Sequence, residues 1–179
     1  MNNKLRIKFD CLENSRLELV ENLEKFGEKE LSFQPYQDKW SIIQVIHHLN
    51  KTEQLSVAYI NKKLQYRTNI KKSGLGAVVK SFLLKLALRS SFRFKAPKFI
   101  ADVPKTDTFE SIKDQWEQTR KDIRKLLDEF PDDFLNKNIF KHAFAGKMNI
   151  YQMLNFMQDH FDHHLKQIGR IRKKLTIDN

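Results

Sequence analysis

Apolar residues recur along this chain at intervals of three and four positions, the spacing of one face of an α-helix. Four long segments show this pattern: residues 3–26, 41–65, 108–130 and 150–175. Little interrupts them, because the 179 residues include only 5 Gly and 4 Pro. The sequence therefore predicts an all-α fold, a four-helix bundle formed by a single domain that spans residues 1–179.

Polar residues and glycine mark the predicted helix ends. Ser41 precedes an apolar run, and Gln44 lies three positions after Ser41, which is the spacing of a capping box at a helix start. Asn149 and Gln152 repeat this spacing at the start of the last helix. Gly27 follows the first apolar stripe, so we expect it to end the first helix.

The connection between the second and third helices, about residues 66–106, is unusually long for a bundle. Apolar residues within it also recur at helical spacing, which predicts an extra short helix there. This stripe consists of Leu75, Val78, Val79, Phe82, Leu83 and Leu86.

The same region contains the whole net charge of the chain, which is +11 at pH 7. Residues 54–101 include eleven Lys and Arg but neither Asp nor Glu, and the remaining sequence is balanced. We therefore expect no nucleic-acid binding by the chain as a whole. For the basic insertion, residues 71–98, two interpretations stay open: its apolar side packs on the bundle or on a second subunit, or it binds a membrane surface or polyanion. The first is favoured, so membrane contact is not expected.

The apolar stretches and the single cysteine bear on where the protein is located and on its redox chemistry. The longest apolar stretch, residues 77–88, contains two lysines and is much shorter than the roughly 20 residues that a membrane helix needs. The one cysteine, Cys11, has no partner within the chain, and we expect a buried structural thiol. The cytoplasm is the expected location of the protein.

Three histidines lie in line with the apolar stripes. His160 and His164 are one turn apart in the last helix, among Met153, Met157, Phe161 and Ile168. His48 lies on the stripe of the second helix. Three neutral imidazoles from two facing helices predict a site for one divalent metal ion, whereas hydrogen-bonded core histidines are the alternative.

Two motifs that contain these histidines resemble the DinB and YfiT-like superfamily of metal-binding four-helix bundles. Residues 40–49, WSIIQVIHHL, resemble the entry to the second helix of that family and align His48 with its histidine. Residues 160–168, HFDHHLKQI, resemble the family's last-helix motif and align His160 and His164 with the other two ligands. Residues 96–98 and 140–146 also resemble family connections, although Ala143 stands where proline is usual.

This resemblance implies an intracellular protein, often a homodimer, that holds nickel, zinc or a similar ion. Nickel and zinc are the ions expected first, and manganese and iron are further options. Some relatives are thiol-dependent S-transferases or isomerases that use low-molecular-weight thiols such as bacillithiol or mycothiol. Many other relatives have no assigned reaction.

Three protein ligands leave an open coordination position, which is typical of catalytic rather than structural zinc sites. Together with this open position, the resemblance implies a metal-dependent thiol S-transferase or a related hydrolase acting on a small-molecule substrate, and a non-catalytic metal-binding or interaction module is the alternative. The candidate proton carriers are His142, in the loop before the last helix, and Glu53, which lies five positions after His48. His47 and His163 are expected on polar surfaces.

Overall fold

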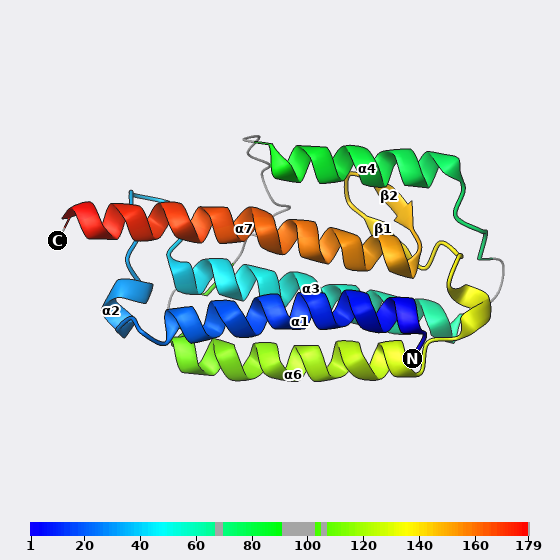
Figure 1. Ribbon diagram of the computed structural model, residues 1–179, viewed down its shortest axis with the longest axis horizontal. Coiled ribbons are helices and arrows are strands. Elements are labelled where there is room, and N and C mark those ends of the chain that lie inside the picture. Colours follow the sequence, from blue (N-terminus) through cyan, green and yellow to red (C-terminus); the bar gives the residue numbers. More distant parts are fainter. Residues whose placement is uncertain (67–69, 91–102, 105–106, 179) are drawn as a thin grey trace.

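Long helices dominate the computed structural model, which describes residues 1–66, 70–90, 103–104 and 107–178. Helices α1 (Asn3–Leu23), α3 (Ile42–Gln65), α6 (Phe109–Asp128) and α7 (Ile150–Asp178) lie side by side along the longest axis of the molecule (Figure 1). Helix α3 contacts α6 and α7, and α1 contacts the same two helices. The predicted all-α class is confirmed, and these are the four long helices that the sequence predicts.

The apolar stripes of these helices meet in one continuous core. Each large apolar side chain that is fully buried contributes about 1.5–3 kcal/mol to folding, so the stripes supply most of the stabilisation of the long helices. On α1 the buried stripe includes Leu5, Phe9, Leu12, Leu19 and Leu23. On α6 it includes Phe109, Ile112, Trp116, Ile123 and Leu126.

Two of the predicted helix starts are present as capping boxes, and one predicted helix end is wrong. The Ser41 hydroxyl accepts from the backbone N–H of Gln44, whose side chain accepts from the Ser41 N–H. Asn149 and Gln152 make the same reciprocal pair. Helix α1, however, already ends at Leu23, and Gly27 has an ordinary φ of −74°. Gly27 instead precedes the short helix α2 (Glu28–Leu31), which it starts by donating its N–H to Glu30.

A short hairpin that the sequence analysis did not anticipate joins α6 to α7. After the 3-10 turn η1 (Asp132–Phe134), strand β1 (Phe140–His142) pairs antiparallel with β2 (Gly146–Met148). Three residues connect the strands, and Gly146 adopts a φ of 76°, the left-handed conformation that such a hairpin requires. The hairpin fixes the position of His142 relative to α7.

The extra helix predicted in the long connection is α4 (Leu75–Arg89), which lies on the outside of the molecule along α7 (Figure 1). Its stripe does not pack on the bundle, which was one of the two expected partners; packing on a second subunit stays a prediction. The six apolar residues predicted as its stripe, called the α4 stripe below, are exposed, with fractions from 50% at Leu86 to 85% at Leu75, and the opposite side of α4 faces the bundle. Residues 91–98 of the basic insertion, which include the family-like segment 96–98, lie outside the described residues. None of the described helices combines the length and the apolar character that crossing a bilayer requires.

Candidate metal centre

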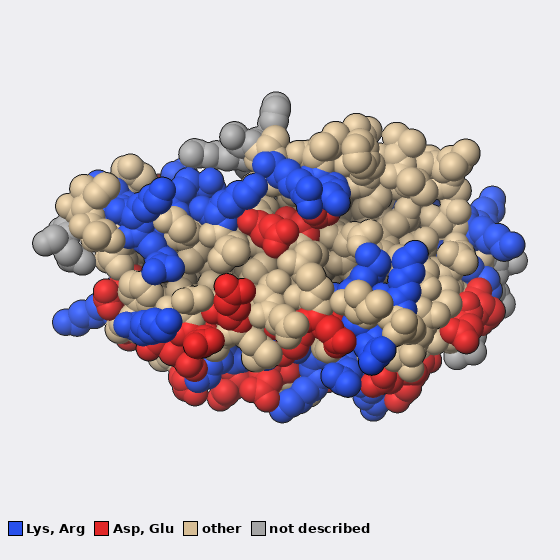
Figure 2. All heavy atoms as spheres, in the orientation of Figure 1, with Lys and Arg blue, Asp and Glu red and all other residues tan. Residues whose placement is uncertain are grey.

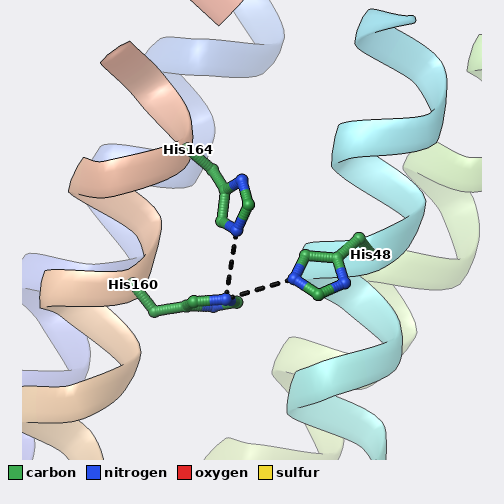
Figure 3. Close-up of side chains that lie close together, drawn as sticks. All are labelled: His48, His160 and His164. Atoms are coloured by element: carbon green, nitrogen blue, oxygen red, sulfur yellow. Dashed lines mark hydrogen bonds between the residues drawn. The ribbon is translucent and has the colours of Figure 1, made fainter. Parts of the chain in front are cut away.

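The three histidines of the predicted site lie together between α3 and α7. His48 comes from α3, whereas His160 and His164 come from consecutive turns of α7, and their rings point toward one another (Figure 3). His48 and His164 are buried, and His160 is half-buried. The stripes of α3 and α7 therefore bring the imidazoles inward, as their spacing predicts.

The ring nitrogens are spaced as ligands of one ion would be. The Nε2 atom of His160 lies 3.2 Å from Nε2 of His48 and 3.1 Å from Nε2 of His164. The three candidate ligand atoms all lie within 4.8 Å of one another. Two nitrogens that each lie about 2.0–2.1 Å from a tetrahedral zinc ion are about 3.3 Å apart. Two edges of the triad thus have nearly the separation that a tetrahedral ion requires.

A hydrogen bond orients the lone pair of His164 toward the other two rings. Nδ1 of His164 lies 2.9 Å from Oε1 of Gln167, an atom that can only accept. The proton is therefore on Nδ1, and Nε2 of the neutral ring has a free lone pair. A partner of this kind on the distal nitrogen is usual for histidines that bind metals, because it fixes the tautomer and the ring orientation.

Burial keeps His160 and His164 neutral. It lowers the pKa of His164 to about 3, an effect that nearby His48 reinforces and the Gln167 hydrogen bond opposes. Burial also lowers the pKa of His160 well below its ordinary value, with additional contributions from the neighbouring imidazoles. Neutral imidazole is the form that coordinates a metal, so these two side chains need no deprotonation at pH 7 to act as ligands. A proton shared between two ring nitrogens links only that pair, whereas one divalent cation could accept a lone pair from each of the three.

Aromatic rings form the walls of this site. The Trp40 ring lies 4.9 Å from the ring of His48 and stacks at 6.4 Å on that of His164, measured between centroids. Phe156 lies 5.4 Å from His160. Such apolar walls restrict the rotation of the imidazoles and lower the local dielectric constant. From the sequence Trp40 is most simply a core residue, but in the structure it packs directly on two of the three histidines.

His142 lies one aromatic ring away from the triad. Its ring packs edge-on against Phe156 at 4.5 Å, and Phe156 in turn contacts His160. Nδ1 of His142 accepts hydrogen bonds from the backbone N–H groups of Phe144 and Ala145, at 3.2 and 3.1 Å. Burial lowers the pKa of His142 to about 4. The ring is therefore neutral at pH 7, with its proton on Nε2.

Glu53 is also buried, but its carboxylate belongs to a different cluster. One oxygen accepts from Trp116 Nε1 at 2.9 Å and from Arg120 Nε at 2.8 Å. The other accepts from a terminal nitrogen of Arg120 at 2.9 Å. Both partners belong to α6, because a side chain five residues after His48 points toward a different neighbour of the helix.

The remaining histidines have partners outside the triad. Nε2 of His47 lies 3.4 Å from a carboxylate oxygen of Asp107. Burial lowers the pKa of His47, and the Asp107 charge partly offsets this effect. His163, expected on a polar surface, is half-buried, with Nδ1 lying 2.7 Å from the carbonyl oxygen of Leu88 at the end of α4. The expectation of a buried Cys11 is wrong, because this side chain is exposed on α1.

Comparison with known families agrees with this fold and these motifs. Residues 12–168 match the model of the DinB superfamily. The chain belongs to the DinB superfamily. A crystal structure of a conserved Enterococcus faecalis protein superimposes on this DinB superfamily member with a TM-score of 0.63, at 14% identity, covering 96% of each chain. At that identity the likeness concerns the fold alone. No curated protein matches the chain.

Proposed function

We propose that this DinB superfamily protein binds one divalent metal ion through Nε2 of His48, His160 and His164. The observation that supports the proposal most directly is the convergence of three imidazole nitrogens from two helices. A donor set made only of imidazoles suits zinc and nickel, whereas manganese prefers carboxylate and carbonyl oxygens. Zinc or nickel is therefore the proposed ion, and iron is a weaker option.

We further propose that the protein transfers a low-molecular-weight thiol, through its sulfur, to a small electrophile. When bound, a divalent ion with three protein ligands keeps a position for the thiol and favours its deprotonation. In the overall reaction a bond forms between the thiol sulfur and the electrophilic carbon. The leaving group departs with its electron pair, and the thiol proton neutralises it. The aromatic walls formed by Trp40 and Phe156 exclude water from the reacting groups.

The structure suggests different roles for the two candidate proton carriers. Because Nδ1 of His142 accepts two backbone hydrogen bonds, its neutral ring presents Nε2–H as a donor. We therefore propose that His142 donates a hydrogen bond to an oxygen of the electrophile rather than accepting the thiol proton. Both oxygens of Glu53 already accept from Trp116 and Arg120, so Glu53 is left out of the proposed chemistry.

The thiol is proposed to come from a second substrate. The side chain of Cys11 is exposed on α1, whereas the histidine triad is buried between α3 and α7. Resemblance to thiol-dependent relatives supports the same assignment. Transfer from glutathione, cysteine, bacillithiol or mycothiol is thus the reaction class to test.

Metal analysis of the purified protein after reconstitution with zinc or nickel tests the first proposal. We expect stoichiometric ion in the wild-type protein, retained through gel filtration. Ion present only in trace amounts with both metals would contradict the metal site and, with it, the thiol reaction.

An activity assay tests the second proposal separately. Metal-loaded protein is given a panel of these thiols and a chromogenic electrophile, with His164→Ala as the blank. We expect at least one thiol to react faster than in the blank. If the wild-type protein binds metal stoichiometrically yet matches the blank with every thiol, it is a non-catalytic metal-binding module.

A further inference from the structure

Among the described residues, six of the exposed large apolar side chains gather on the outer face of α4. All six members of the α4 stripe are at least half exposed. Exposed apolar side chains elsewhere are more dispersed; Ile7 and Leu17, for example, are ten residues apart on α1. Contiguous apolar surface of this kind marks a site of interaction with a protein or a membrane.

The opposite face of α4 is apolar as well, and it is the face that packs on α7. It consists of the half-buried residues Ala77, Ser81 and Leu84 and the buried residue Leu88. Helix α4 therefore has apolar side chains on both sides. A helix with this composition is normally covered on both sides, so the α4 stripe requires a second apolar environment.

Positive charges border the stripe. On a helical wheel Lys80 and Lys85 project on opposite sides of it, and exposed Lys71 and Lys72 precede the helix. Neither Asp nor Glu occurs within residues 54–101. In Figure 2 the surface over α4 is mostly tan, and the acidic residues gather mainly over the half of the molecule formed by α1 and α6. The partner of the stripe should therefore be both apolar and anionic.

We propose that the α4 stripe docks onto the surface of an anionic phospholipid membrane. The apolar side chains would enter the boundary between headgroups and acyl chains, while the flanking lysines meet lipid phosphates. A second copy of the chain fits this surface less well. A two-fold contact through α4 would bring Lys80 and Lys85 of both copies together, and the acidic group beside α4, Asp159, already pairs with Arg89 of its own chain.

Docking through α4 would hold the histidine triad close to the bilayer, because the end of α4 is attached to the helix that supplies two of the ligands. His163 contacts the Leu88 carbonyl oxygen at 2.7 Å, and Arg89 lies 3.4 Å from the carboxylate of Asp159. Asp159 and His163 directly precede His160 and His164 in α7. The docking proposal itself depends only on α4, and it stands or falls independently of the bound metal.

Vesicle sedimentation of the full chain tests the proposal. We expect the protein to bind phosphatidylcholine vesicles that contain phosphatidylglycerol, and to bind pure phosphatidylcholine vesicles much less. The double variant Phe82→Glu/Leu83→Glu should abolish binding. Replacing both Lys80 and Lys85 by Gln should weaken it about thirtyfold, the effect of removing two cations close to an anionic surface. Leu17→Glu, an exposed apolar position on α1, is the matched control and should bind like the wild type.

All of these variants alter exposed or half-buried side chains, and circular dichroism establishes that they remain folded. Absence of vesicle binding by the wild-type protein would overturn the proposal, as would equal binding to the two vesicle types. Light scattering identifies the rival occupant: a dimer that Phe82→Glu/Leu83→Glu converts to a monomer, without vesicle binding, would assign the stripe to a second copy. Binding lost equally in Leu17→Glu would remove α4 from the interaction.

Discussion

Helix α3 contributes to two buried polar clusters that face different neighbours. Toward α6, the carboxylate of Glu53 accepts three hydrogen bonds from Trp116 and Arg120, and Arg120 also contacts Glu13 of α1. Toward α7, His48 meets His160 and His164 through ring nitrogens of one kind. The first cluster pairs donors with acceptors and positive with negative charges. The second cluster brings together three imidazole nitrogens, which are atoms of the same chemical type.

This difference separates a structural cluster from a ligand site. Buried polar groups are tolerated when their hydrogen bonds are satisfied, and the Glu53 cluster meets that condition with protein atoms alone. In the histidine triad three ring nitrogens converge, and one divalent cation could accept a lone pair from each of them. Burial by itself therefore does not distinguish a candidate ligand site from a structural cluster. The chemical type of the converging atoms makes that distinction.

The largest expected effect is on metal binding by His160→Ala. Only two imidazoles would remain, and the ion would be held mainly by water, so we expect the loss of stoichiometric zinc or nickel in elemental analysis. His163→Asn is the matched control, because its amide can keep the contact with the Leu88 carbonyl and should leave the metal content unchanged.

The two outcomes of this experiment separate the clusters further. Helical circular dichroism should survive both His160→Ala and chelation of the metal, since the apolar stripes and the Glu53 cluster stabilise the fold without an ion. Equal metal loss in the two variants would contradict the assignment of ligands on α7. Unfolding on chelation would contradict the view that only the first cluster is structural.

The next largest effect is on stability, by Glu53→Ala. This substitution leaves buried Arg120 without its main partner, a change that typically costs about 3–5 kcal/mol of unfolding free energy. Urea denaturation measures the loss, and the folded fraction should still bind metal stoichiometrically. Lys121→Ala, which removes an exposed ion pair with Glu117 on the same helix, is the control and should leave the denaturation midpoint unchanged. If Glu53→Ala lost its metal but kept its stability, Glu53 would belong to the metal site and not to the structural cluster.

A smaller effect is expected for the group that orients the triad. Gln167→Ala removes the acceptor for Nδ1–H of His164, and loss of such a partner typically weakens metal affinity about 10–100-fold. Competition with a chromophoric chelator measures the affinity. Gln167→Glu keeps an acceptor and should retain tight binding, whereas Gln158→Ala, elsewhere on α7, should have no effect. An unchanged affinity in Gln167→Ala would show that the ring is oriented by its aromatic walls.

The smallest effect concerns the pH dependence of stability. Burial lowers the pKa of folded His142 to about 4, whereas the unfolded chain retains a value near 6.5. Between these values the unfolded state binds the additional proton, so stability falls as the pH decreases from about 6.5 to 4 and no further proton from His142 contributes below that range. Urea midpoints of the metal-free protein at several pH values should show a slope reduced by up to one proton in His142→Gln. An identical slope in both proteins would place His142 in a more hydrated environment.

Local and periodic features of the fold were predictable from the sequence. The stripe of each long helix repeats every three to four residues, because that face must be buried, and the capping boxes at Ser41 and Asn149 depend on neighbouring residues only. The same periodicity predicted that the three histidines point inward. Gly27 and Cys11 were misassigned because a glycine after a stripe can also precede a new helix, and because Cys11 lies at the edge of its stripe.

Contacts between distant segments were not predictable in the same way. For α4 the spacing identified a helix with an apolar stripe, but both sides of the helix are apolar, and the small side chains of Ala77 and Ser81 allow the other side to approach α7. The stacking of Trp40 on the triad and the pairing of Glu53 with Arg120 likewise join segments that no spacing rule relates.

The helices and the inward direction of the three imidazoles thus follow from the order of residues alone, because hydrophobic periodicity specifies a face of each helix. Three other outcomes follow from packing between helices: the Nε2 atoms lie 3.1–3.2 Å apart along two edges of the triad, Glu53 pairs with Arg120, and the α4 stripe remains exposed. Those outcomes depend on which helices pack together and how closely, and helix packing is set by the shapes of side chains far apart in the chain.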